Sequence, residues 1–584
     1  MNRKSAMGPI LGISPLDKDA TASLYLDGEW RAIAEERLSR KKLHKGFPRR
    51  AVEQLLASEG IAVSDIEVVV YPFRPWWMEA AQITTGYCSN LRQTAMDDSD
   101  AEAKRRHLAS YAGWCRESIL AHRRYNAELR TGLEHLGWKG GVQWTEHHAA
   151  HTAGAYLTSG FEEALCITLD WYGGGLSGAV TRCGRAAMKT LAVFRYPHSL
   201  GLFYAQVTGA LGFRMSRHEG KVVGLAGYGD PGELGRMVLD RFRIAGGRFR
   251  YPAAMDGKFI RELAAAYSRH EVAAACQFAL DKMVTGIAAY WISRTGLTKV
   301  VLSGGVTANV KTNQRICELD SVKEVFVHPN MGDGGTGVGA TAAHLFQQGR
   351  IGSIEWKTCF LGPEYADSRI SRVLAESGVE SFETMARPAE RIAALLAGGN
   401  VVARFDGRME YGPRALGNRS ILCTATDPAV NDWLNRRLGR SEFMPFAPVT
   451  LASHCEARYG LASKQRLTGR FMTATTPCTD LMKRESPAAV HVDGTARPLF
   501  LHRDDNEGLY EIVEAYYRLT GIPTLINTSF NMHEEPIVCS PEDAVRVFLK
   551  GHLDYLAIGS WLVAHPALSR PVRRHSEPVL GQTN

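Results

Sequence analysis

Residues 165–175 have the sequence LCITLDWYGGG, and this stretch decides how the first half of the chain is interpreted. Its run of apolar and β-branched residues is typical of a buried strand, which Asp170 ends at a glycine turn. The same order of apolar strand and glycine turn recurs at 300–309 and at 325–337. Because helical stretches alternate with these strands, the sequence predicts an α/β fold.

The composition is that of an ordinary globular protein, with 584 residues, 45% hydrophobic and 22% charged residues, and a net charge of +8. A chain of this length is expected to form about two to four domains. The basic residues are dispersed and lack interleaved aromatic residues, which argues against a nucleic-acid partner. No apolar run suggests a membrane span. Eleven scattered cysteines without a CxxC pair indicate a reducing cytoplasm.

A change of pattern near residue 353 divides the chain. Residues 1–352 are expected to form the first domain, with a helical insertion at about 71–136, and residues 353–364 a linker. Residues 365–565 are expected to form a second domain, followed by a polar tail at 566–584. Strands are expected at 10–13, 22–26, 32–35 and 522–527, and helices at 102–136 and 427–438. No internal repeat is recognised in the sequence.

Two histidines, His147 and His151, lie four residues apart in the stretch TEHHAAHTAGAYL. The alanine-rich context favours a helix, on which this spacing places both rings on one face. Asp170 and Asp333 lie at glycine turns that follow strands, where carboxylates suit metal ligation. Two imidazoles and two carboxylates suit iron(II), zinc or manganese. The alternative is a structural histidine pair, and His148, on another face, is the poorer ligand candidate.

The three glycine turns can also present backbone N–H groups to a phosphate at a helix N-terminus. The sequence therefore nominates a set of nucleotide-binding residues: Gly173, Gly174, Gly304, Gly305, Asn309, Gly334 and Gly335. The alternative is that these glycines form turns and nothing more.

A second unusual stretch, RMEYGPRALGNRS at 408–420, contains three arginines and two glycines around a single acid. Arginine offers a planar fork of donors that matches phosphate and carboxylate groups. Glycine lets the backbone approach a ligand closely. Because the block follows the apolar run at 401–403, we interpret it as a site for a multiply charged anion, with a basic surface loop as the alternative.

Nine ordered motifs give the chain a family resemblance. They include SGGVTANV, GDGGTGVGA and EYGPRALGNRS from the stretches above. The others are LGISPLDKDATASL at 11–24, EERLSR at 35–40, HSLGLFYAQVTGALGF at 198–213, EGKVVGLAGYG at 219–229, HVDGTARP at 491–498 and PTLINTSFN at 523–531. The chain resembles the NodU/CmcH O-carbamoyltransferases, whose best-known member modifies the antibiotic tobramycin.

The resemblance implies two domains with different tasks. The first is an actin-like ATPase domain of the ASKHA, Kae-like type, and its metal, usually iron, would be held by His147, His151, Asp170 and Asp333. The second is a YrdC-like α/β domain, in which carbamoyl phosphate and ATP, with Mg²⁺, give carbamoyladenylate and pyrophosphate. The carbamoyl group then passes to a hydroxyl of a small natural product. The resemblance implies no nucleic acid and no membrane, and it allows a homodimer.

The resemblance also assigns roles in the second domain and in the first turn. The residues implied to bind carbamoyl phosphate and the adenylate are Arg414, Arg419, Arg440, Arg497, Asn527, Thr528 and Ser529, and Arg414 and Arg497 are also expected to be catalytic. Arg419 could instead support its loop, and Asn527 could cap a turn. Lys18 and Asp19 stand where many relatives have a His-Asp pair, so they are the catalytic candidates there. A lysine is a poor base unless its pKa is lowered.

The chain departs from its relatives at a second place, 438–448, where the sequence is LGRSEFMPFAP. Leu438, Ser441 and Met444 replace a lysine, a glutamate and an arginine of many relatives, while Arg440 remains. If the missing cations bind a phosphate in those relatives, Arg436 or Arg437 are the candidates to substitute.

Other functions are compatible with parts of the sequence. A threonylcarbamoyl transferase acting on tRNA would explain the histidine pair, but it lacks a fused second domain of this kind. An actin-like kinase or a non-catalytic ATP-binding module would leave residues 408–420 and 523–531 without a role. The aromatic residues of the insertion, Trp76, Trp77, Tyr87 and Trp114, either shape an acceptor pocket or pack its helices, and packing is the favoured interpretation.

Overall fold

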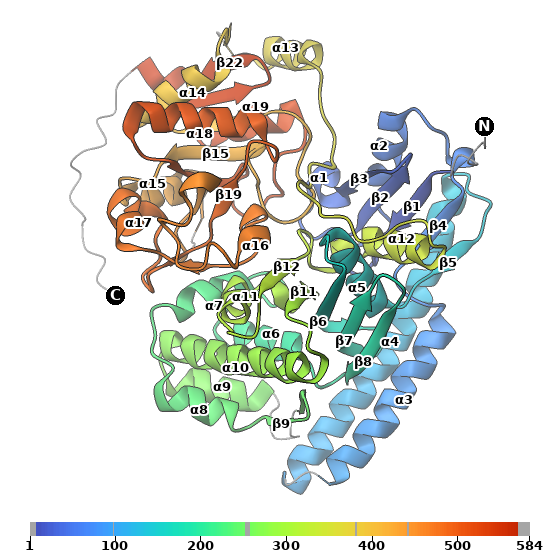
Figure 1. Ribbon diagram of the computed structural model, residues 1–584. Coiled ribbons are helices and arrows are strands. Elements are labelled where there is room, and N and C mark those ends of the chain that lie inside the picture. The colour runs from blue at the N-terminus through green and yellow to red at the C-terminus, as the bar shows by residue number, and fades with distance from the viewer. Residues whose placement is uncertain (1–7, 97–98, 251–256, 380–381, 441–442, 570–584) are drawn as a thin grey trace.

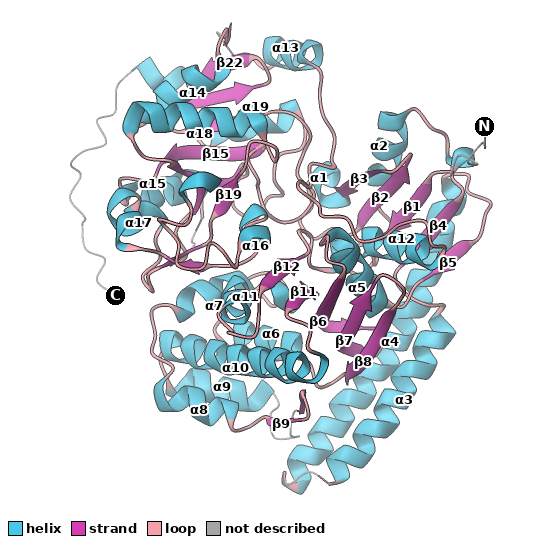
Figure 2. Cartoon of the chain, in the orientation of Figure 1, coloured by secondary structure: helices cyan, strands magenta, loops and turns pink. Residues whose placement is uncertain are grey.

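The fold is described by a computed structural model that covers residues 8–96, 99–250, 257–379, 382–440 and 443–569. Helices and strands alternate along the described chain (Figure 2), so the predicted α/β class is confirmed. Two sheets organise the first half of the chain and a larger sheet organises the second half (Figure 1).

The two sheets of the first half share one strand order. The first sheet has the order β3-β2-β1-β4-β5, and the second has the order β8-β7-β6-β11-β12. In each, three strands form an antiparallel meander, and the last two strands run parallel to the first strand of that meander. This duplicated arrangement is what the resemblance to actin-like ATPases implies, although the sequence shows no repeat.

The strands of these two sheets have the following bounds. Those of the first sheet are β1 Ile10–Ile13, β2 Thr21–Leu26, β3 Glu29–Ala34, β4 Val68–Tyr71 and β5 Val142–Trp144. Those of the second sheet are β6 Glu163–Gly173, β7 Leu176–Gly184, β8 Met188–Arg195, β11 Lys299–Ser303 and β12 Glu324–Val327.

Two helices, α5 (His147–Thr158) and α12 (Thr336–Gln347), pack against each other between the two sheets. Helix α12 contacts strands of the first sheet, and α5 contacts strands of the second. The crossing is close, because a Cβ atom on Gly339 would lie 2.1 Å from the carbonyl oxygen of Ala150. Small residues are therefore required here, which explains the alanine-rich sequence around the histidine pair and fixes the helix that carries it.

Two long helices, α3 (Trp76–Ala95) and α4 (Ala101–His135), lie between β4 and β5 and project from the first sheet (Figure 1). Helix α4 confirms the helix expected at 102–136. Asp100 caps α4 by accepting a hydrogen bond from the backbone N–H of Ala103.

A group of helices lies beside the second sheet, and its longest member is α10 (Arg269–Thr295). By length and composition alone α10 could cross a membrane, which the sequence analysis did not recognise, yet 67% of its apolar window is buried inside the protein. The other helices of this group are α6 Leu200–Ala210, α7 Glu219–Ala226, α8 Gly232–Leu239, α9 Gly257–Ala266 and α11 Val310–Cys317.

The second half of the chain is built on a mixed sheet of eight described strands in the order β13-β22-β21-β14-β15-β20-β16-β19. Neighbouring strand residues alternate between its faces, so Val402 packs beneath α14 and α18 while Ala403 packs beneath α13 and α19. The strands are β13 Phe382–Thr384, β14 Val402–Phe405, β15 Arg419–Thr424, β16 Ala447–Leu451, β19 Leu499–Leu501, β20 Thr524–Ser529, β21 Tyr555–Ile558 and β22 Trp561–Ala564. The helices are α13 Asp367–Glu376, α14 Pro388–Ala397, α18 Glu507–Thr520 and α19 Pro541–Lys550.

Most of the expected elements are present with small shifts. The strands expected at 10–13, 22–26 and 32–35 are β1, β2 and β3, and the helix expected at 427–438 is α15 (Ala429–Leu438). The strand expected at 522–527 is β20, which starts two residues later because Pro523 has no N–H to donate to a neighbouring strand. Residues 570–584 of the expected tail lie outside the described residues.

The two halves are joined by side-chain and backbone contacts. Within the stretch at 353–364, Leu361 accepts a hydrogen bond from the backbone N–H of Ala32 at 3.1 Å. Arg40, which follows the short helix α1 (Glu35–Ser39), donates to the carbonyl oxygens of Pro536 and Ile537 at 2.7 and 2.8 Å. The halves therefore meet along a bonded interface, and a cavity lies within it.

Candidate functional site

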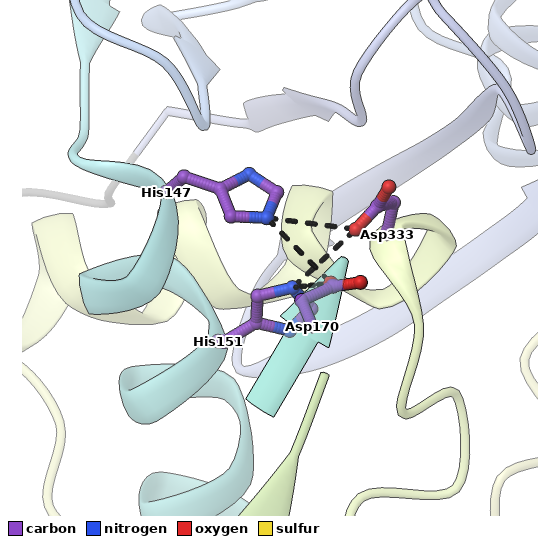
Figure 3. A group of neighbouring side chains, drawn as sticks. All are labelled: His147, His151, Asp170 and Asp333. Carbon is purple, nitrogen blue, oxygen red and sulfur yellow. Dashed lines mark ion pairs between the residues drawn. The ribbon is translucent and has the colours of Figure 1, made fainter. Parts of the chain in front are cut away.

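The four predicted metal ligands converge between the two sheets of the first half (Figure 3). His147 and His151 lie one turn apart at the start of α5, Asp170 lies in β6, and Asp333 lies just before α12. The Nε2 atom of His151 lies 3.3 Å from Asp170 Oδ2 and 3.5 Å from Asp333 Oδ1. The Nε2 atom of His147 lies 3.9 and 3.5 Å from the same two oxygens.

These four side chains are between 1% and 5% exposed. Within the described part of the chain, both Nε2 atoms and the two facing carboxylate oxygens have no hydrogen-bond partner. Buried polar atoms without partners are costly, so such a group calls for a ligand. The four candidate ligand atoms lie within 4.8 Å of one another, and this donor set fits a divalent metal ion.

The charges of the group keep its carboxylates ionised. Burial and the neighbouring Asp333 tend to raise the pKa of Asp170, but the two histidines and Lys18 outweigh them and lower it to about 2. Burial tends to lower the pKa of His147, but Asp170 and Asp333 raise it to about 10. The carboxylates are therefore available as metal ligands, whereas His147 must lose a proton when it binds an ion.

Neighbouring groups orient the ligands from behind. The hydroxyl of Ser303 lies 3.0 Å from Nδ1 of His151, and the backbone N–H of Trp171 donates to Asp170 Oδ1 at 2.7 Å. The ring of Phe73 stacks on His147 with a centroid distance of 4.7 Å. Such contacts fix the direction in which a ligand atom points.

The Lys18-Asp19 pair lies beside this group, and the two side chains have different protonation behaviour. The Nζ atom of Lys18 lies 3.4 Å from Asp333 Oδ2, and Asp333 raises the pKa of Lys18. Lys18 therefore stays protonated and can stabilise negative charge but cannot act as a base. Burial, followed by the charge of Glu36, raises the pKa of Asp19 to about 7, so Asp19 can take up a proton near neutral pH.

Asp17 is a site residue that the sequence analysis missed. It lines a cavity beside the metal group, and burial and Asp333 raise its pKa to about 6. Asp17 was missed because the family resemblance points to Lys18 and Asp19, and a single carboxylate in a loop carries no sequence pattern of its own.

The predicted nucleotide-binding glycines pack against protein atoms. A Cβ atom on Gly173 would lie 2.0 Å from His147 Cδ2, one on Gly305 would lie 2.9 Å from Asp170 Oδ1, and one on Gly334 would lie 2.7 Å from Asp19 Oδ2. Three others meet neighbours in the same way: Gly174 meets Glu79, Gly304 meets Leu169, and Gly335 meets Asn330. These glycines therefore let the protein's own backbone and side chains approach closely. These contacts favour the alternative in which the glycines form turns.

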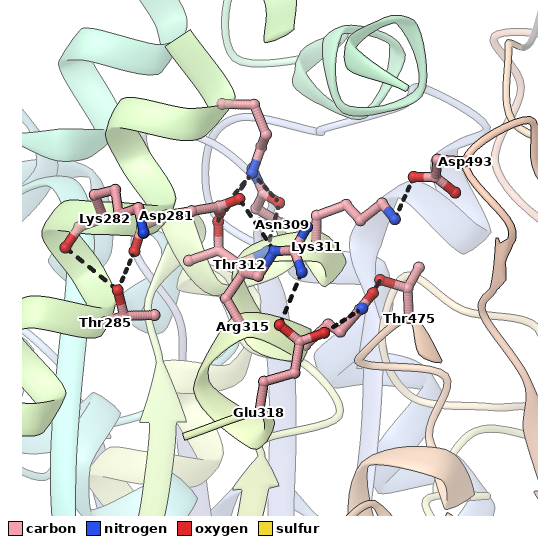
Figure 4. Close-up of polar contacts among 12 residues, drawn as sticks. Asp281, Lys282, Thr285, Asn309, Lys311, Thr312, Arg315, Glu318, Thr475 and Asp493 are labelled. Atoms are coloured by element: carbon pink, nitrogen blue, oxygen red, sulfur yellow. Dashed lines mark hydrogen bonds and ion pairs between the residues drawn. The ribbon is translucent and has the colours of Figure 1, made fainter. Parts of the chain in front are cut away.

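Asn309 lies in a polar network between α10 and α11 (Figure 4). Its Nδ2 donates to Gln277 Oε1 at 2.9 Å, and its Oδ1 accepts from the backbone N–H of Thr312. Gln277 also lines a cavity of about 530 Å³ on these helices, which we call the helical cavity. Asp493 of the second half reaches its edge and forms an ion pair with Lys311. Polar residues on one face of α10 look like a solvated surface in the sequence, so they were not singled out.

A third site, which we call the cationic cavity, has a volume of about 300 Å³ and lies between the two halves. Among its described lining residues, Glu534 is the only acid. Six side chains supply positive charge: Lys42, Arg217, Lys221, Arg414, Arg440 and Arg497. So many cations in a small enclosed volume repel one another unless an anion lies among them.

Arg414 and Arg497, predicted from separate motifs, both line this cavity. Burial, followed by the positive charge of Arg497, lowers the pKa of Arg414. Arg414 Nε is buried and has no hydrogen-bond partner in the described chain, while Nη2 makes a long contact of 3.4 Å with the carbonyl of Ala308. The side chain is thus fixed by few protein contacts and is free to bind an anion.

The other predicted residues of the cavity come from β20 and from the end of α15. Asn527, Thr528 and Ser529 line it, and Asn527 Oδ1 is buried without a described hydrogen-bond partner. Arg440 also lines it, but its guanidinium donates to Thr528 Oγ1 and to the carbonyls of Ser529 and Asn531. Arg440 therefore shapes the strand end as well as contributing charge.

The departure at 438–448 has a structural explanation. Leu438 is completely buried in the core of the second half, and Met444 lines the cationic cavity. Arg436 and Arg437, the candidate substitutes, are not among its lining residues. Arg437 instead lies 5.2 Å from the ring of Trp433. Ser441 lies outside the described residues.

Arg419 does not lie in the cavity, which corrects its assignment as an anion-binding residue. It is completely buried, and its guanidinium lies 3.7 Å from the centroid of the Phe405 ring. It donates to the backbone carbonyls of Asp406, Gly407 and Asn418 at 2.7 to 3.0 Å. Both terminal nitrogens of the guanidinium donate to backbone carbonyls, and only Nε has no described partner, so Arg419 supports the loop that presents Arg414.

Replacing Arg419 by methionine is expected to destabilise the protein by about 3–5 kcal/mol, because buried carbonyl groups lose a charged donor. Chemical denaturation of the full-length protein, followed by far-UV circular dichroism, would measure the loss. The matched control is Arg436→Met on exposed α15, which should change stability by less than about 0.5 kcal/mol. Equal stability of the two variants would contradict the structural role of Arg419.

Comparison with known proteins identifies the family. A two-domain carbamoyl-transfer protein is indicated, because residues 9–342 match the carbamoyltransferase N-terminus and residues 393–565 match the carbamoyltransferase C-terminus. The chain therefore belongs to the carbamoyltransferase family and is a transferase. The resemblance to the NodU/CmcH enzymes is confirmed.

Relatives match along most of the chain. Nodulation protein NolNO of Sinorhizobium fredii is 30% identical over 561 residues, which cover 93% of this chain and 78% of that protein. Uncharacterized protein MJ1051 of Methanocaldococcus jannaschii is 32% identical over 575 residues, which cover 95% and 99%. Among solved structures, full-length HypF in its phosphate- and nucleotide-bound form is 14% identical, with a TM-score of 0.34, and the match covers 59% of this chain and 56% of that one.

Proposed function

We propose that this protein is an ATP-dependent O-carbamoyltransferase that makes carbamoyladenylate in the cationic cavity and transfers the carbamoyl group beside the metal group. The acceptor is a hydroxyl of a small natural product, as in antibiotic tailoring. The observation that carries the proposal is the cationic cavity, where six cations and one acid among the described residues surround about 300 Å³.

Two polyanions must meet for the first step, and the cavity is suited to that task. Water attacks the phosphorus of carbamoyl phosphate, so that the bond to the carbamoyl oxygen breaks and inorganic phosphate and carbamate form. A carbamate oxygen then attacks the α-phosphorus of ATP, and pyrophosphate is displaced. Arg414 and Arg497 neutralise phosphate charge, and ATP brings Mg²⁺ with it. Asn527 Oδ1, buried and without a described partner, can accept a hydrogen bond from the carbamoyl amide, which supports this assignment.

The helical cavity is the proposed site for the adenosine part of the nucleotide in the first half. Gln277 and Asp281 on α10 line it. Lys311 and Arg315 on α11 (Figure 4), which are paired with neighbouring acids, supply its positive charge for a phosphate. Val223 lines both this cavity and the cationic cavity. The two cavities are therefore adjacent, which gives the adenylate a short path from one half to the other.

In the second step the acceptor hydroxyl oxygen bonds to the carbamoyl carbon, the bond from that carbon to the adenylate oxygen breaks, and AMP leaves. His147, His151, Asp170 and Asp333 would hold the metal, which when bound supplies Lewis acidity toward a carbonyl or phosphoryl oxygen. Lys18, kept protonated by Asp333, stabilises the developing negative charge. Asp19 is the nominated acceptor of the hydroxyl proton.

A reducing cytoplasm is the proposed location. All eleven cysteines lie in the described part of the chain as free thiols, and ten of them are buried. Free thiols persist where the compartment is reducing.

The test of this function is exchange of labelled pyrophosphate into ATP by the purified full-length protein. Exchange should depend on carbamoyl phosphate and should need no acceptor. A kinase or an ATP-binding module would give no such exchange, and its absence under varied metal supply would refute the proposal.

Replacing Lys18 by methionine is expected to slow transfer to the acceptor by about 10²-fold, because a charge donor to the transition state is lost. Pyrophosphate exchange should be unchanged, because Lys18 lies outside the cationic cavity. Lys41→Met, in the exposed loop after α1, is the matched control and should leave both steps unchanged. Transfer by the Lys18 variant at the normal rate would remove Lys18 from the mechanism.

A further inference from the structure

A cavity of about 510 Å³ lies between the inserted helix α4 and the metal group. Its deeper lining residues Phe73, Ser118 and His122 are buried, whereas Glu117, Leu120 and Arg124 are exposed and lie at its mouth. Its volume falls within the range of roughly 300–1,000 Å³ that small-molecule pockets occupy. We call it the insertion cavity.

The walls of the insertion cavity include four aromatic side chains, Phe73, Trp114, Tyr125 and Tyr172, and two of these are held by neighbouring groups. Trp114 lines the cavity and stacks on Tyr196, with a centroid distance of 3.8 Å. Tyr172 meets Trp114 edge-on at 4.9 Å, and its hydroxyl is bonded to Ser118 at 2.6 Å and to His122. Aromatic walls locked in this way are preorganised for a flat ligand, because binding costs little side-chain entropy.

These contacts answer the question that the aromatic residues of the insertion raised. Trp114 both packs and lines a pocket, whereas Tyr87 packs on Tyr111 and is absent from the lining. Trp76 and Trp77 are 36% and 60% exposed at the start of α3, outside the cavity.

The insertion cavity leads to the metal group through two of its lining residues. The ring of Phe73 lines it on one side and stacks on His147 on the other. Asp17 also lines it, and the adjacent Lys18 pairs with Asp333. A hydroxyl of a molecule in this cavity could therefore point toward the group where transfer is proposed.

The charge of the cavity restricts the kind of molecule that fits. Its described lining contains two acids, Asp17 and Glu117, and a single cation, Arg124. His122 adds no charge, because burial and the nearby His147 lower its pKa to about 3. An anionic acceptor would find no net positive charge, in contrast to the cationic cavity. A polycationic sugar would find only two carboxylates to pair with, and its remaining charges would face aromatic and apolar side chains.

We infer that the insertion cavity binds the acceptor, and that the acceptor is a neutral or singly cationic alcohol with a flat apolar or aromatic ring system. The inference rests on the proposed function and adds the chemical class of the substrate. The ring packs against Trp114 and Tyr172, and the hydroxyl points past Asp17 toward the metal group and Asp19.

The first test compares three probes that share a benzyl alcohol core and differ in charge through the para substituent: benzyl alcohol (neutral), 4-(hydroxymethyl)benzylamine (cationic) and 4-(hydroxymethyl)benzoate (anionic). Ligand-observed NMR with the full-length protein would measure their binding. The neutral and cationic probes should bind at least about tenfold more tightly than the anionic one, because the two acids of the lining repel the carboxylate. A tenfold difference in affinity corresponds to only about 1.4 kcal/mol of binding free energy. Tighter binding of the benzoate, or binding of none of the three, would overturn the inference.

The second test fills the cavity from its own helix. Ala121→Trp places a bulky side chain in the lining, and Ala112→Trp, at an exposed position of α4 outside the lining, is the matched control. The Ala121 variant should lose probe binding by about tenfold or more and the control should retain it. Wild-type binding by a folded Ala121 variant would overturn the inference, as would equal loss by both variants.

Pyrophosphate exchange separates this inference from the proposed function. Both variants should exchange at the wild-type rate, because the cationic cavity is untouched. If the wild-type protein shows exchange but binds no probe, the proposed function is supported and the proposed acceptor site is contradicted. Probe binding without exchange would contradict the function and leave a ring-alcohol site beside the metal group.

Discussion

Replacing Arg414 by alanine is expected to reduce carbamoyl-phosphate-dependent pyrophosphate exchange by about 10²–10³-fold, the usual cost of losing one preorganised donor to a transition state. Arg414 lines the cationic cavity beside Arg497, and its Nε is buried without a described partner. Few protein contacts depend on it, so its loss should affect chemistry and hardly affect folding. Exchange assays and thermal denaturation on the same samples would measure both.

The matched comparison is Arg419, five residues further along the same motif, at the start of β15. Arg419→Met should lower stability, as argued above, whereas Arg414→Ala should keep stability and lose exchange. Arg414→Lys should recover part of the exchange, because lysine restores the charge but not the planar fork. Metal content should stay constant in all three variants. Metal loss in the Arg414 variant would show that the loop serves the metal group, and wild-type exchange would remove Arg414 from the cavity's chemistry.

The contrast between Arg414 and Arg419 shows where inference from sequence reaches its limit. Both arginines stand in one motif, and both are spaced from glycines. The loop at 408–420 has no regular period, so no pattern says which side chain faces a ligand. Arg419 is turned inward because Phe405 and several backbone carbonyls surround it. Only the path of the backbone decides this.

Regular elements allow better prediction, and the metal group is the clearest example. The spacing of His147 and His151 fixes their relative placement on a helix, and Asp170 is placed by strand β6, which continues past it to Gly173 although the sequence predicted its end at Asp170. The glycine turns are ambiguous for a physical reason. Glycine marks close approach, but the sequence does not say whether a phosphate or the His147 ring approaches Gly173.

The duplicated sheet order of the first half was also invisible in the sequence. Apolar runs predict where strands lie in the sequence, but they do not say which strands pair or in what order. The two units carry their extra helices at different places. In the first unit α3 and α4 lie between β4 and β5, and in the second α6 to α10 lie between β8 and β11. These insertions hide the common spacing, and they also form the walls of the insertion cavity and the helical cavity.

Replacing Asp170 by alanine is expected to abolish metal binding and with it carbamoyl transfer, while pyrophosphate exchange stays at the wild-type rate. Asp170 faces both histidines, and its side chain otherwise accepts a hydrogen bond only from the backbone N–H of Trp171 among the described contacts. The loss of one of four donors leaves too few ligands for tight binding. Elemental analysis of the purified protein would measure the metal and identify it as iron, zinc or manganese.

A thermal measurement gives an independent readout of the same event. A ligand present at about a thousandfold excess over its Kd stabilises a folded protein by about 4 kcal/mol. A chelator should therefore lower the melting temperature of the wild type and leave that of the Asp170 variant unchanged. His148→Gln is the matched control, because His148 is equally buried on α5 but lies outside the four-residue group. It should keep metal, exchange and transfer. Metal retained by the Asp170 variant, or lost by the His148 variant, would show that the ion is held by other residues. The metal group and the cationic cavity share no residue among those described, so the two steps are expected to be independent. Loss of exchange along with the metal would show that they are not.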